Sequence, residues 1–430
     1  MTMLRSTAIE PGRSTLRFLT AGSVDDGKST LIGRLLFEGK AVLADQLDTL
    51  RKRAAGSPID LSLLTDGLEA EREQGITIDV AYRYFNTPNR KFIIADAPGH
   101  EQYTRNMVTA AAGSDAAVVL VDITKLDTGA RPMALLPQTR RHALLAKLLR
   151  VPGIVFAINK LDACADPAGD YQAVREALLD FARRAGIEVA GIVPISALLG
   201  LNVTQPLDAP WYDGPTLLQI LEKLPTARRD VAGPLLLPVQ YVARDGGGSG
   251  NQPRTLWGRI ARGRVRAGDL VELLPGGESA RVVEVRRAGE PVSAAEAGES
   301  AGLMLDRQLD VSRGDWVCAP ASVAIGHRLS ATIAWLDSEP AVVGRKYWIR
   351  HGHAWVQARI VRIESRLDIE SLATTAADRL AVNEIGQVLV EVQRPLPIEP
   401  YAVNPVAGAM IMVDPASNRT SGAVLVSSRG

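Results

Sequence analysis

Eight residues near the start of the chain have the types and spacing that cradle phosphate groups. They read Gly-Ser-Val-Asp-Asp-Gly-Lys-Ser over 22–29, which fits the pattern Gly-x-x-x-x-Gly-Lys-Ser/Thr. In this pattern the glycines let backbone N–H groups point at phosphate oxygens, and the following helix adds the positive end of its dipole. Lys28 would then reach the β- and γ-phosphates, and Ser29 would offer its hydroxyl to Mg²⁺. We predict nucleotide contacts at Gly22, Ser23, Val24, Asp25, Asp26, Gly27, Lys28, Ser29 and Thr30.

A second polar group could choose the base that the site accepts. It follows the apolar run 153–158, at the end of an expected strand, where sheets of alternating strands and helices place their ligands. Guanine carries adjacent N1–H and N2–H donors, so one carboxylate can accept from both, whereas adenine offers no such pair. We therefore predict that Asp162 selects guanine. The residues assigned to this contact are Asn159, Lys160, Leu161 and Asp162.

The loop 96–100 also follows an expected strand and has residue types that can sense a γ-phosphate. Asp96 can hold Mg²⁺ through a water molecule. Gly99 lacks a side chain, so its N–H can approach the γ-phosphate closely. His100 can orient the attacking water, a task that a Gln performs in other GTPases, and we predict this role over that of an ordinary exposed histidine. The whole loop is assigned to the nucleotide: Asp96, Ala97, Pro98, Gly99 and His100.

Thr77 and the tripeptide 196–198 take their interpretation from these motifs. The Thr77 hydroxyl could bind Mg²⁺ only while the γ-phosphate is present, so hydrolysis would release its loop; the alternative is a β-branched residue at a strand start. Ser196, Ala197 and Leu198 follow another apolar run, and a backbone N–H there could contact the guanine O6. The predicted catalytic residues are Lys28, Thr77 and His100, and the predicted Mg²⁺ ligands are Ser29, Thr77 and Asp96, the last through water.

The elements that must position these residues alternate between strands and helices. Runs rich in Val and Ile fit strands buried on both faces of a parallel sheet, and they cover 16–21, 92–95, 116–121, 153–158 and 192–195. Helical stretches lie between them at 28–37, 138–149 and 173–184. The run 78–85 alternates apolar and polar residues, as an edge strand does. The pattern predicts an α/β P-loop GTPase domain with a doubly wound, mostly parallel sheet.

The composition changes near 225–238, and the rest of the chain reads as β-structure. Val-rich runs alternate with turn signals such as Gly268-Asp269 and Gly314-Asp315, a spacing typical of β-barrels. We predict a GTP-binding domain over 1–230, a β-barrel domain over 231–325 and a second β-barrel domain over 326–430. A chain of 430 residues is long enough for two or three domains.

The totals are typical of a globular protein. Hydrophobic residues make up 46% and charged residues 23% of the chain. A formal net charge of +1 predicts no general attraction to nucleic acid or to an anionic membrane. Residues 1–14 lack the apolar run of a signal peptide, and no apolar run approaches the length of a membrane span. Cys164 and Cys318 are expected to be reduced thiols in a cytoplasmic protein.

Together the motifs resemble those of translation-factor GTPases, of which elongation factor Tu is the best-known member. The shared pieces are Gly-Ile-Thr-Ile at 75–78, Asp-Ala-Pro-Gly-His at 96–100 and Asn-Lys-Leu-Asp at 159–162. The likeness is closer to the GTPase subunit (subunit 1) of bacterial sulfate adenylyltransferase, or ATP sulfurylase, over 22–36, 66–85 and 100–107. Elongation factors usually have His where Asp26 stands. The resemblance spans about 16–426 and is densest before residue 200.

The resemblance implies a reaction that spacing alone does not show. In that family the GTPase pairs with a catalytic subunit that binds ATP and sulfate, and the heterodimer makes adenosine 5′-phosphosulfate and pyrophosphate. Forming the phosphosulfate anhydride is strongly uphill, and GTP hydrolysis drives it through conformational change. The chain would thus be a GTPase and regulatory subunit of a nucleotidyltransferase in sulfate assimilation, with GTP as substrate and Mg²⁺ as cofactor.

Two other functions stay open at this point. An elongation factor that delivers aminoacyl-tRNA would share several motifs, but Asp26 in place of His argues against it. A small-molecule kinase could use the phosphate loop, but Asp162 argues against it. Some members of the resembled family carry a fused adenylylsulfate kinase domain. This chain stops at Gly430 and shows no second phosphate loop, so we expect that kinase activity to be lacking.

Three further features receive no functional assignment. The segment 123–137 is longer and more irregular than elongation factors have there, and its Lys125, Asp127 and Arg131 are interpreted as a solvated loop. The tract 246–250 is interpreted as a mobile hairpin loop. His351 and His353 would share one face of a strand, but with no third ligand in sight we assign no metal site to them.

Overall fold

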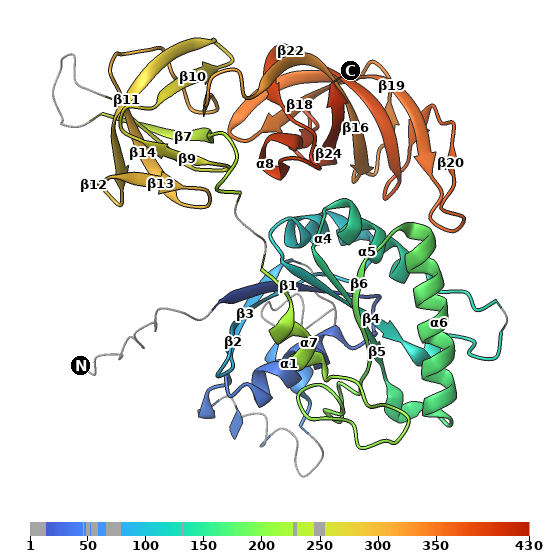
Figure 1. Cartoon of the computed structure of the whole chain (residues 1–430). Helices are drawn as coiled ribbons and strands as arrows, with labels where there is room; N and C mark the ends of the chain where they lie inside the picture. Colours follow the sequence, from blue (N-terminus) through green and yellow to red (C-terminus); the bar gives the residue numbers. More distant parts are fainter. Residues whose placement is uncertain are drawn as a thin grey trace. The chain divides into compact units, whose positions relative to one another are not determined.

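The computed structural model describes residues 14–45, 47–48, 52, 59–65, 79–130, 132–226, 230–244 and 254–429 (Figure 1). The chain divides into two compact units. One is Met1–Ala227 with Ile369–Leu372, and the other is Arg228–Asp368 with Ala373–Gly430. Within the described part of the chain, no helix is both long enough and apolar enough to cross a membrane.

A six-stranded sheet forms the centre of the first unit, in the order β2-β3-β1-β4-β5-β6. Five of its strands pair in parallel, and β2 joins β3 antiparallel at the edge. This order confirms the predicted doubly wound, mostly parallel sheet, in which β2 is the edge strand. The strands are β1 (Thr15–Ala21), β2 (Ala81–Asn86), β3 (Lys91–Asp96), β4 (Ala116–Asp122), β5 (Gly153–Asn159) and β6 (Val189–Pro194).

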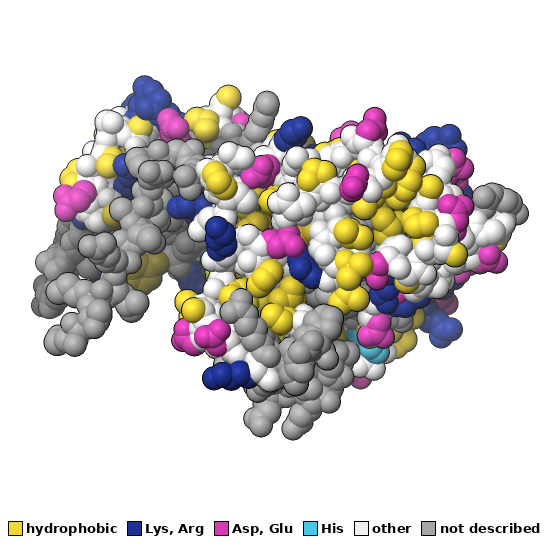
Figure 2. Space-filling view, turned by 90° about the horizontal axis from the view of Figure 1, so that it is seen from below, with side chains coloured by type: hydrophobic (Ala, Val, Ile, Leu, Met, Phe, Trp, Pro, Cys, Tyr) yellow, Lys and Arg dark blue, Asp and Glu magenta, His cyan; other side chains and the backbone are white. Residues whose placement is uncertain are grey.

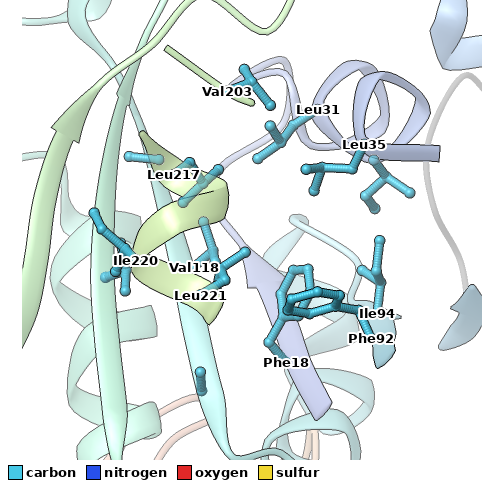
Figure 3. Packing of buried hydrophobic residues seen from close by; sticks show 14 of the residues in the cluster. Phe18, Leu31, Leu35, Phe92, Ile94, Val118, Val203, Leu217, Ile220 and Leu221 are labelled. Atoms are coloured by element: carbon cyan, nitrogen blue, oxygen red, sulfur yellow. The ribbon is translucent and has the colours of Figure 1, made fainter. Parts of the chain in front are cut away.

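Helices cover both faces of this sheet. On one face α1 and α7 pack against β1, β3 and β4 around Phe18 and Phe92 (Figure 3). Alternate residues of β4, Val119 and Val121, point to the other face and are also buried. There α4 contacts β1, and α5 contacts β4 and β5. The helices are α1 (Lys28–Glu38), α4 (Thr104–Ala111), α5 (Pro137–Leu148), α6 (Pro167–Ala185) and α7 (Leu217–Lys223), with 3-10 turns η1 (Leu61–Leu64), η2 (Glu101–Tyr103), η3 (Ile123–Lys125) and η4 (Leu161–Ala163).

The sequence at the ends of α6 explains its length. The Asp166 side chain accepts a hydrogen bond from the Gly169 N–H, which caps the first turn, and Pro167 occupies the first helical position. Gly186 ends the helix in the left-handed conformation (φ 62°), which glycine adopts without steric cost. Arg183 lies in the last turn, where a cation favours the helix dipole.

The second unit contains two rings of antiparallel strands. In the first ring the neighbours run β10-β15-β7-β8-β14-β11, and β11 pairs back to β10. In the second they run β18-β23-β24-β16-β22-β19, and β19 pairs back to β18. Closure leaves neither ring with an open sheet edge. The two predicted β-barrels are therefore confirmed.

Each ring encloses its own core of aliphatic side chains. The first ring and its neighbours comprise β7 (Leu236–Arg244), β8 (Arg254–Arg259), β9 (Arg264–Arg266), β10 (Leu270–Leu274), β11 (Glu278–Arg287), β12 (Glu290–Val292), β13 (Ala294–Glu296), β14 (Ser300–Leu305) and β15 (Trp316–Cys318). The second comprises β16 (Ala324–Trp335), β17 (Ala341–Val342), β18 (Lys346–His351), β19 (Ala354–Leu367), β20 (Thr374–Thr375), β21 (Arg379–Leu380), β22 (Ile385–Ile398), α8 (Pro405–Gly408), β23 (Ala409–Val413) and β24 (Thr420–Arg429). Both rings lie in one compact unit, so the division at residues 230 and 325 remains a prediction.

Buried contacts join the two rings inside this unit. Arg262, between β8 and β9, donates from Nη1 to both carboxylate oxygens of Glu399 at 2.9 Å. Trp316 of the first ring stacks on His351 of the second, with ring centroids 5.0 Å apart. On the face drawn in Figure 2, acidic and basic side chains are interspersed among the described residues, in keeping with the low net charge.

Candidate nucleotide site

The predicted motifs converge at the carboxyl ends of β1, β3 and β5. A cavity of about 460 Å³ lies there, within the usual size range of small-molecule sites. Thirteen of the predicted residues line it: Val24, Asp25, Gly27, Lys28, Ser29, Thr30, Gly99, His100, Asn159, Lys160, Asp162, Ala197 and Leu198. Ser62 and Ala163, which the sequence did not single out, line it as well.

The other predicted residues lie outside the lining. Gly22, Ser23 and Asp26 belong to the phosphate loop, and Asp96, Ala97 and Pro98 belong to the loop after β3. Leu161 is buried, and its N–H donates to the Ile195 carbonyl at 3.2 Å. Ser196 is buried beside the lining residue Ala197. Thr77 lies outside the described residues, as do Arg131 and the tract 246–250.

The phosphate loop is shaped by its glycines and closed by its lysine. Gly27 has a φ of 92°, and a Cβ there would come 2.4 Å from the Asn159 Nδ2, so only glycine fits. Lys28 is 8% exposed, and its ammonium donates to the Gly22 carbonyl at 3.0 Å and to the Ser23 carbonyl at 2.7 Å. Burial lowers the pKa of Lys28, while nearby Asp26 and Asp96 oppose that shift. The loop thus holds one buried cation at the cavity.

The loop after β3 meets the phosphate loop at Gly99. A Cβ on Gly99 would lie 2.3 Å from the Lys28 Nζ and 2.5 Å from the Gly22 carbonyl oxygen. This close approach requires glycine and brings the backbone of the loop to the lysine that the motif assigns to phosphate. Gln138, at the start of α5, donates to the Gly99 carbonyl at 3.2 Å. A hydrogen bond therefore connects α5 to the loop after β3.

His100 is exposed at the rim of the cavity. Its Nδ1 accepts a hydrogen bond from the Gln102 N–H at 3.3 Å, and its ring lies edge-on to Tyr103 with centroids 6.1 Å apart. The hydrogen bond on Nδ1 places the proton of a neutral imidazole on Nε2. His100 is therefore placed where its ring can contact solvent inside the cavity.

At the other end of the cavity, the Asn159 side chain forms hydrogen bonds that connect two loops of the protein. Its Nδ2 donates to the Asp26 carbonyl at 2.8 Å, and its Oδ1 accepts from the Ala197 N–H at 2.9 Å. Both ends of its amide are thereby used to join the phosphate loop to the 196–198 loop. The sequence predicted a nucleotide contact for Asn159 and did not reveal this bracing role. Asp162, in η4, is exposed beside it, as a base-contacting carboxylate must be.

Four charged side chains form a group at the cavity, in which Lys160 lines it and Asp26, Asp122 and Lys125 do not. Lys125 contacts the Asp26 carboxylate at 2.8 Å, and Lys160 contacts Asp122 at 2.7 Å. Burial raises the pKa of Asp122, but hydrogen bonds from Lys160 and Thr124 outweigh burial and hold that pKa below its usual value. The solvated-loop interpretation is therefore wrong for Lys125, because the 3-10 turn η3 directs its ammonium at the phosphate loop.

The residues present fit a Mg²⁺ ion that is held mainly by nucleotide phosphates. Mg²⁺ in such sites takes one or two protein oxygen ligands and completes its shell with phosphate and water. Ser29 lines the cavity next to Lys28, and Asp96 ends β3 close by. Among the described residues no group of three or more His, Cys, Asp or Glu side chains could hold a metal by itself. The oxygen atoms of Ser29 and Asp96 therefore suit a Mg²⁺ ion whose other ligands are phosphate and water.

The two histidines without a functional assignment lie in the second unit. His351 is fully buried, and its Nε2 lies 2.9 Å from the Ala407 carbonyl oxygen of α8. Burial lowers the pKa of His351 to about 4. Cys164 and Cys318 are free thiols, as expected.

Comparisons with known proteins agree with this geometry. Residues 13–226 match the elongation factor Tu GTP binding domain, and residues 328–427 match the GTP-eEF1A C-terminal domain-like family. The chain is 40% identical over 428 residues to sulfate adenylyltransferase subunit 1 of Laribacter hongkongensis, covering 97% of this chain and 86% of that protein. It is 42% identical over 426 residues to the subunit 1 of Sodalis glossinidius, covering 96% and 86%. It is 43% identical over 429 residues to the bifunctional enzyme CysN/CysC of Xylella fastidiosa, covering 98% of this chain but 66% of that longer protein.

Proposed function

The chain belongs to the family of sulfate adenylyltransferase subunit 1, and from this membership we propose that it hydrolyses GTP to drive sulfate activation by a catalytic partner. The partner, in this proposal, binds ATP and sulfate and forms adenosine 5′-phosphosulfate and pyrophosphate. The relatives' name, subunit 1, supports a second subunit. The chain itself supplies the guanine-nucleotide site.

One observation carries the GTPase part of the proposal. The backbone of Gly99 comes so close to Lys28 that a side-chain carbon would overlap its ammonium. A phosphate bound by Lys28 therefore lies within reach of the loop that ends in His100. Loss of the terminal phosphate removes the ligand that both loops share, so the loop after β3 becomes free to rearrange.

In the proposed reaction each residue has a limited task. Lys28 attracts the β- and γ-phosphates, and the low dielectric of its site strengthens that attraction. Ser29, together with Thr77 and with Asp96 through water, would hold Mg²⁺, which neutralises developing charge on the phosphates. Gly99 donates its N–H to the γ-phosphate, and His100 orients the attacking water for in-line attack.

At the end of the cavity that would hold the base, Asp162 and the backbone of 196–198 select guanine in this proposal. Asp162 accepts from N1–H and N2–H of guanine, and a contact of this kind discriminates by about 1–3 kcal/mol. The braced backbone of 196–198 offers an N–H to the guanine O6. Adenine offers no such pair of donors to the Asp162 carboxylate, so ATP would bind without this contact. The same carboxylate argues against a small-molecule kinase that uses ATP.

The proposal is tested with the purified chain and the catalytic subunit of the same organism. We expect GTP to raise the rate of sulfate-dependent pyrophosphate release, because hydrolysis of GTP offsets the uphill formation of the anhydride. The Lys28→Ala chain should bind the partner but give no stimulation, since it lacks the phosphate-binding cation. Tight binding of aminoacyl-tRNA together with no effect on pyrophosphate release would instead support an elongation factor.

A further inference from the structure

We propose that Lys125 is a positioning residue of the nucleotide site, which neutralises the buried carboxylate of Asp26 and so keeps the phosphate loop able to accept a triphosphate. The two residues come from separate places where the sequence departs from elongation factors. Asp26 stands where those proteins usually have His, and Lys125 lies in the irregular segment 123–137. In the structure these two departures meet, with Nζ and Oδ1 2.8 Å apart.

The contacts of Asp26 explain why its carboxylate needs a cation. The side chain is fully buried, and its Oδ2 accepts from the Ser23 N–H at 2.6 Å. This bond holds the turn of the phosphate loop, but it places a negative charge beneath the site for an anion. An unpaired carboxylate in that position would repel phosphate and would cost several kcal/mol to bury. Lys125 supplies the compensating charge from outside the loop.

Lys125 also contacts the loop backbone and the neighbouring strand end. Its ammonium donates to the Val24 carbonyl at 2.6 Å and lies 3.7 Å from the Asp122 carboxylate. Burial acts to lower the pKa of Lys125, but the hydrogen bond to Asp26 and the negative charges of Asp26, Asp122 and Asp25 together outweigh it, so the pKa lies above its usual value. The ammonium is therefore charged, and it is held by two hydrogen bonds and a longer ion pair with Asp122. Its side chain is 33% exposed, whereas those of Asp26 and Asp122 are 0% and 1% exposed.

Asp122 extends the same network to the base-selecting end. It receives Lys160 at 2.7 Å, and Lys160 directly follows Asn159, whose amide reaches back to the Asp26 carbonyl. A closed path therefore runs from Asp26 through Lys125, Asp122 and Lys160 to Asn159 and back to Asp26. Along this path Lys125 is the link between the phosphate loop and the end of β4.

The charges around Asp26 predict how much affinity each nucleotide loses when Lys125 is replaced. Removal of the Lys125 ammonium leaves the Asp26 charge uncompensated, and Lys28 becomes its nearest remaining counterion. The penalty grows with the negative charge of the ligand, so a triphosphate should lose more affinity than a diphosphate. A merely structural role for Lys125 would weaken both ligands equally, because both occupy the same loop.

The test is calorimetric titration of the full-length chain with a non-hydrolysable GTP analogue and with GDP, in Mg²⁺. Lys125→Met should weaken the analogue by at least about tenfold and GDP by a smaller factor. Lys125→Arg should bind nearly as the natural chain does. The double variant Lys125→Met with Asp26→Asn should regain most of the loss, since the neutral amide still accepts from the Ser23 N–H but carries no charge.

Lys147→Met is the matched control. Lys147 is also a lysine of the first unit that donates to a backbone carbonyl, that of Ala185, but it does not line the cavity. Its loss should leave nucleotide affinity unchanged. Unchanged affinity in Lys125→Met would overturn the proposal, and so would equal losses for both ligands that the double variant does not recover. The inference rests on the proposed GTP site, whose failure would be seen separately as absence of binding by the natural chain.

Discussion

Lys28 is the residue on which the proposed phosphate chemistry depends most. Its ammonium is buried and is already directed at the cavity by two carbonyl oxygens of its own loop. Burial lowers its pKa, and a bound phosphate would restore preference for the charged form. A cation that is held in place needs little rearrangement to bind its ligand, which is the advantage of a preorganised site.

His100 is the residue whose role depends most on the γ-phosphate. His100→Ala should slow GTP hydrolysis by about 100-fold or more while leaving GTP affinity nearly unchanged, because in the proposed reaction the ring orients water and does not hold the nucleotide. Single-turnover hydrolysis and equilibrium binding measure the two effects separately. Hydrolysis at the natural rate would show that another group positions the water.

His351 makes the second unit sensitive to acid. Its pKa is about 4 in the folded protein against a usual value of 6.5, so the unfolded chain binds the proton more readily over that interval. Stability from this residue is complete above about pH 6.5 and falls as the pH drops toward 4. We expect His351→Gln to reduce the loss of unfolding free energy between about pH 7 and pH 5, as measured by urea titration. An identical pH dependence in the variant would contradict the assignment.

The sequence predicted the side chains of the site but not the residues that they contact within the protein. Five of the eight residues in the pattern over 22–29 line the cavity, and the pattern could place them there because the phosphate loop is a local structure. The brace formed by Asn159 and the charge of Lys125 escaped prediction, because each depends on a contact across more than ninety residues of sequence. The only hint was that Asp26 and the segment 123–137 both departed from the elongation-factor pattern.

At the scale of elements, the loops after β1 and β3 form the working parts of the site. A parallel sheet brings their strand ends together, since β1 pairs with β3 from Thr15 to Thr20. The position of Gly99 is therefore fixed by strand register, and the close contact with Lys28 follows from it. Gln138, at the start of α5, donates a hydrogen bond to the Gly99 carbonyl and so connects this loop to the helix.

Gly99→Ala tests this contact. The added carbon would meet the Lys28 Nζ and the Gly22 carbonyl, and the backbone oxygen cannot move without shifting the phosphate loop. We expect GTP hydrolysis to fall by about 100-fold with little change in melting temperature. Gly113→Ala is the control, because a carbon there meets nothing within 4 Å. Equal activities of the two variants would mean that the loops are not in contact in the working enzyme.

Element prediction succeeded where burial was continuous. The five parallel strands appeared as runs of Val and Ile because both faces of the sheet are covered. The short helices α4 and α7 were not predicted, since α4 has only eight residues and α7 seven, too few to show a clear helical period. The barrels were predicted from turn residues, but their closure depends on β10–β11 and β18–β19 pairing, which no local pattern encodes.

At the scale of the whole molecule, the two rings of the second unit are joined by a buried ion pair. The side chains of Arg262 and Glu399 are 6% and 12% exposed. Removal of one partner leaves a buried charge, so Arg262→Met should cost about 3–5 kcal/mol of unfolding free energy. Arg262→Met combined with Glu399→Leu should cost less, because no charge remains. Denaturant titration of the four chains measures the coupling.

An exposed ion pair provides the comparison for that experiment. The side chains of Arg183 and Asp180 on α6 are 79% and 48% exposed. Water screens such pairs, so Arg183→Met should change stability by less than about 1 kcal/mol. If Arg262→Met had an equally small effect, the pair between the rings would not be what joins them.

The proposed function depends on the cavity being a guanine-nucleotide site. Calorimetric titration of the full-length chain with GTP, GDP and ATP in the presence of Mg²⁺ tests this most directly. We predict binding of GTP and GDP, with ATP weaker by at least about tenfold because adenine cannot satisfy Asp162. Preference for ATP, or no binding of either guanine nucleotide, would show that the cavity is not a guanine-nucleotide site.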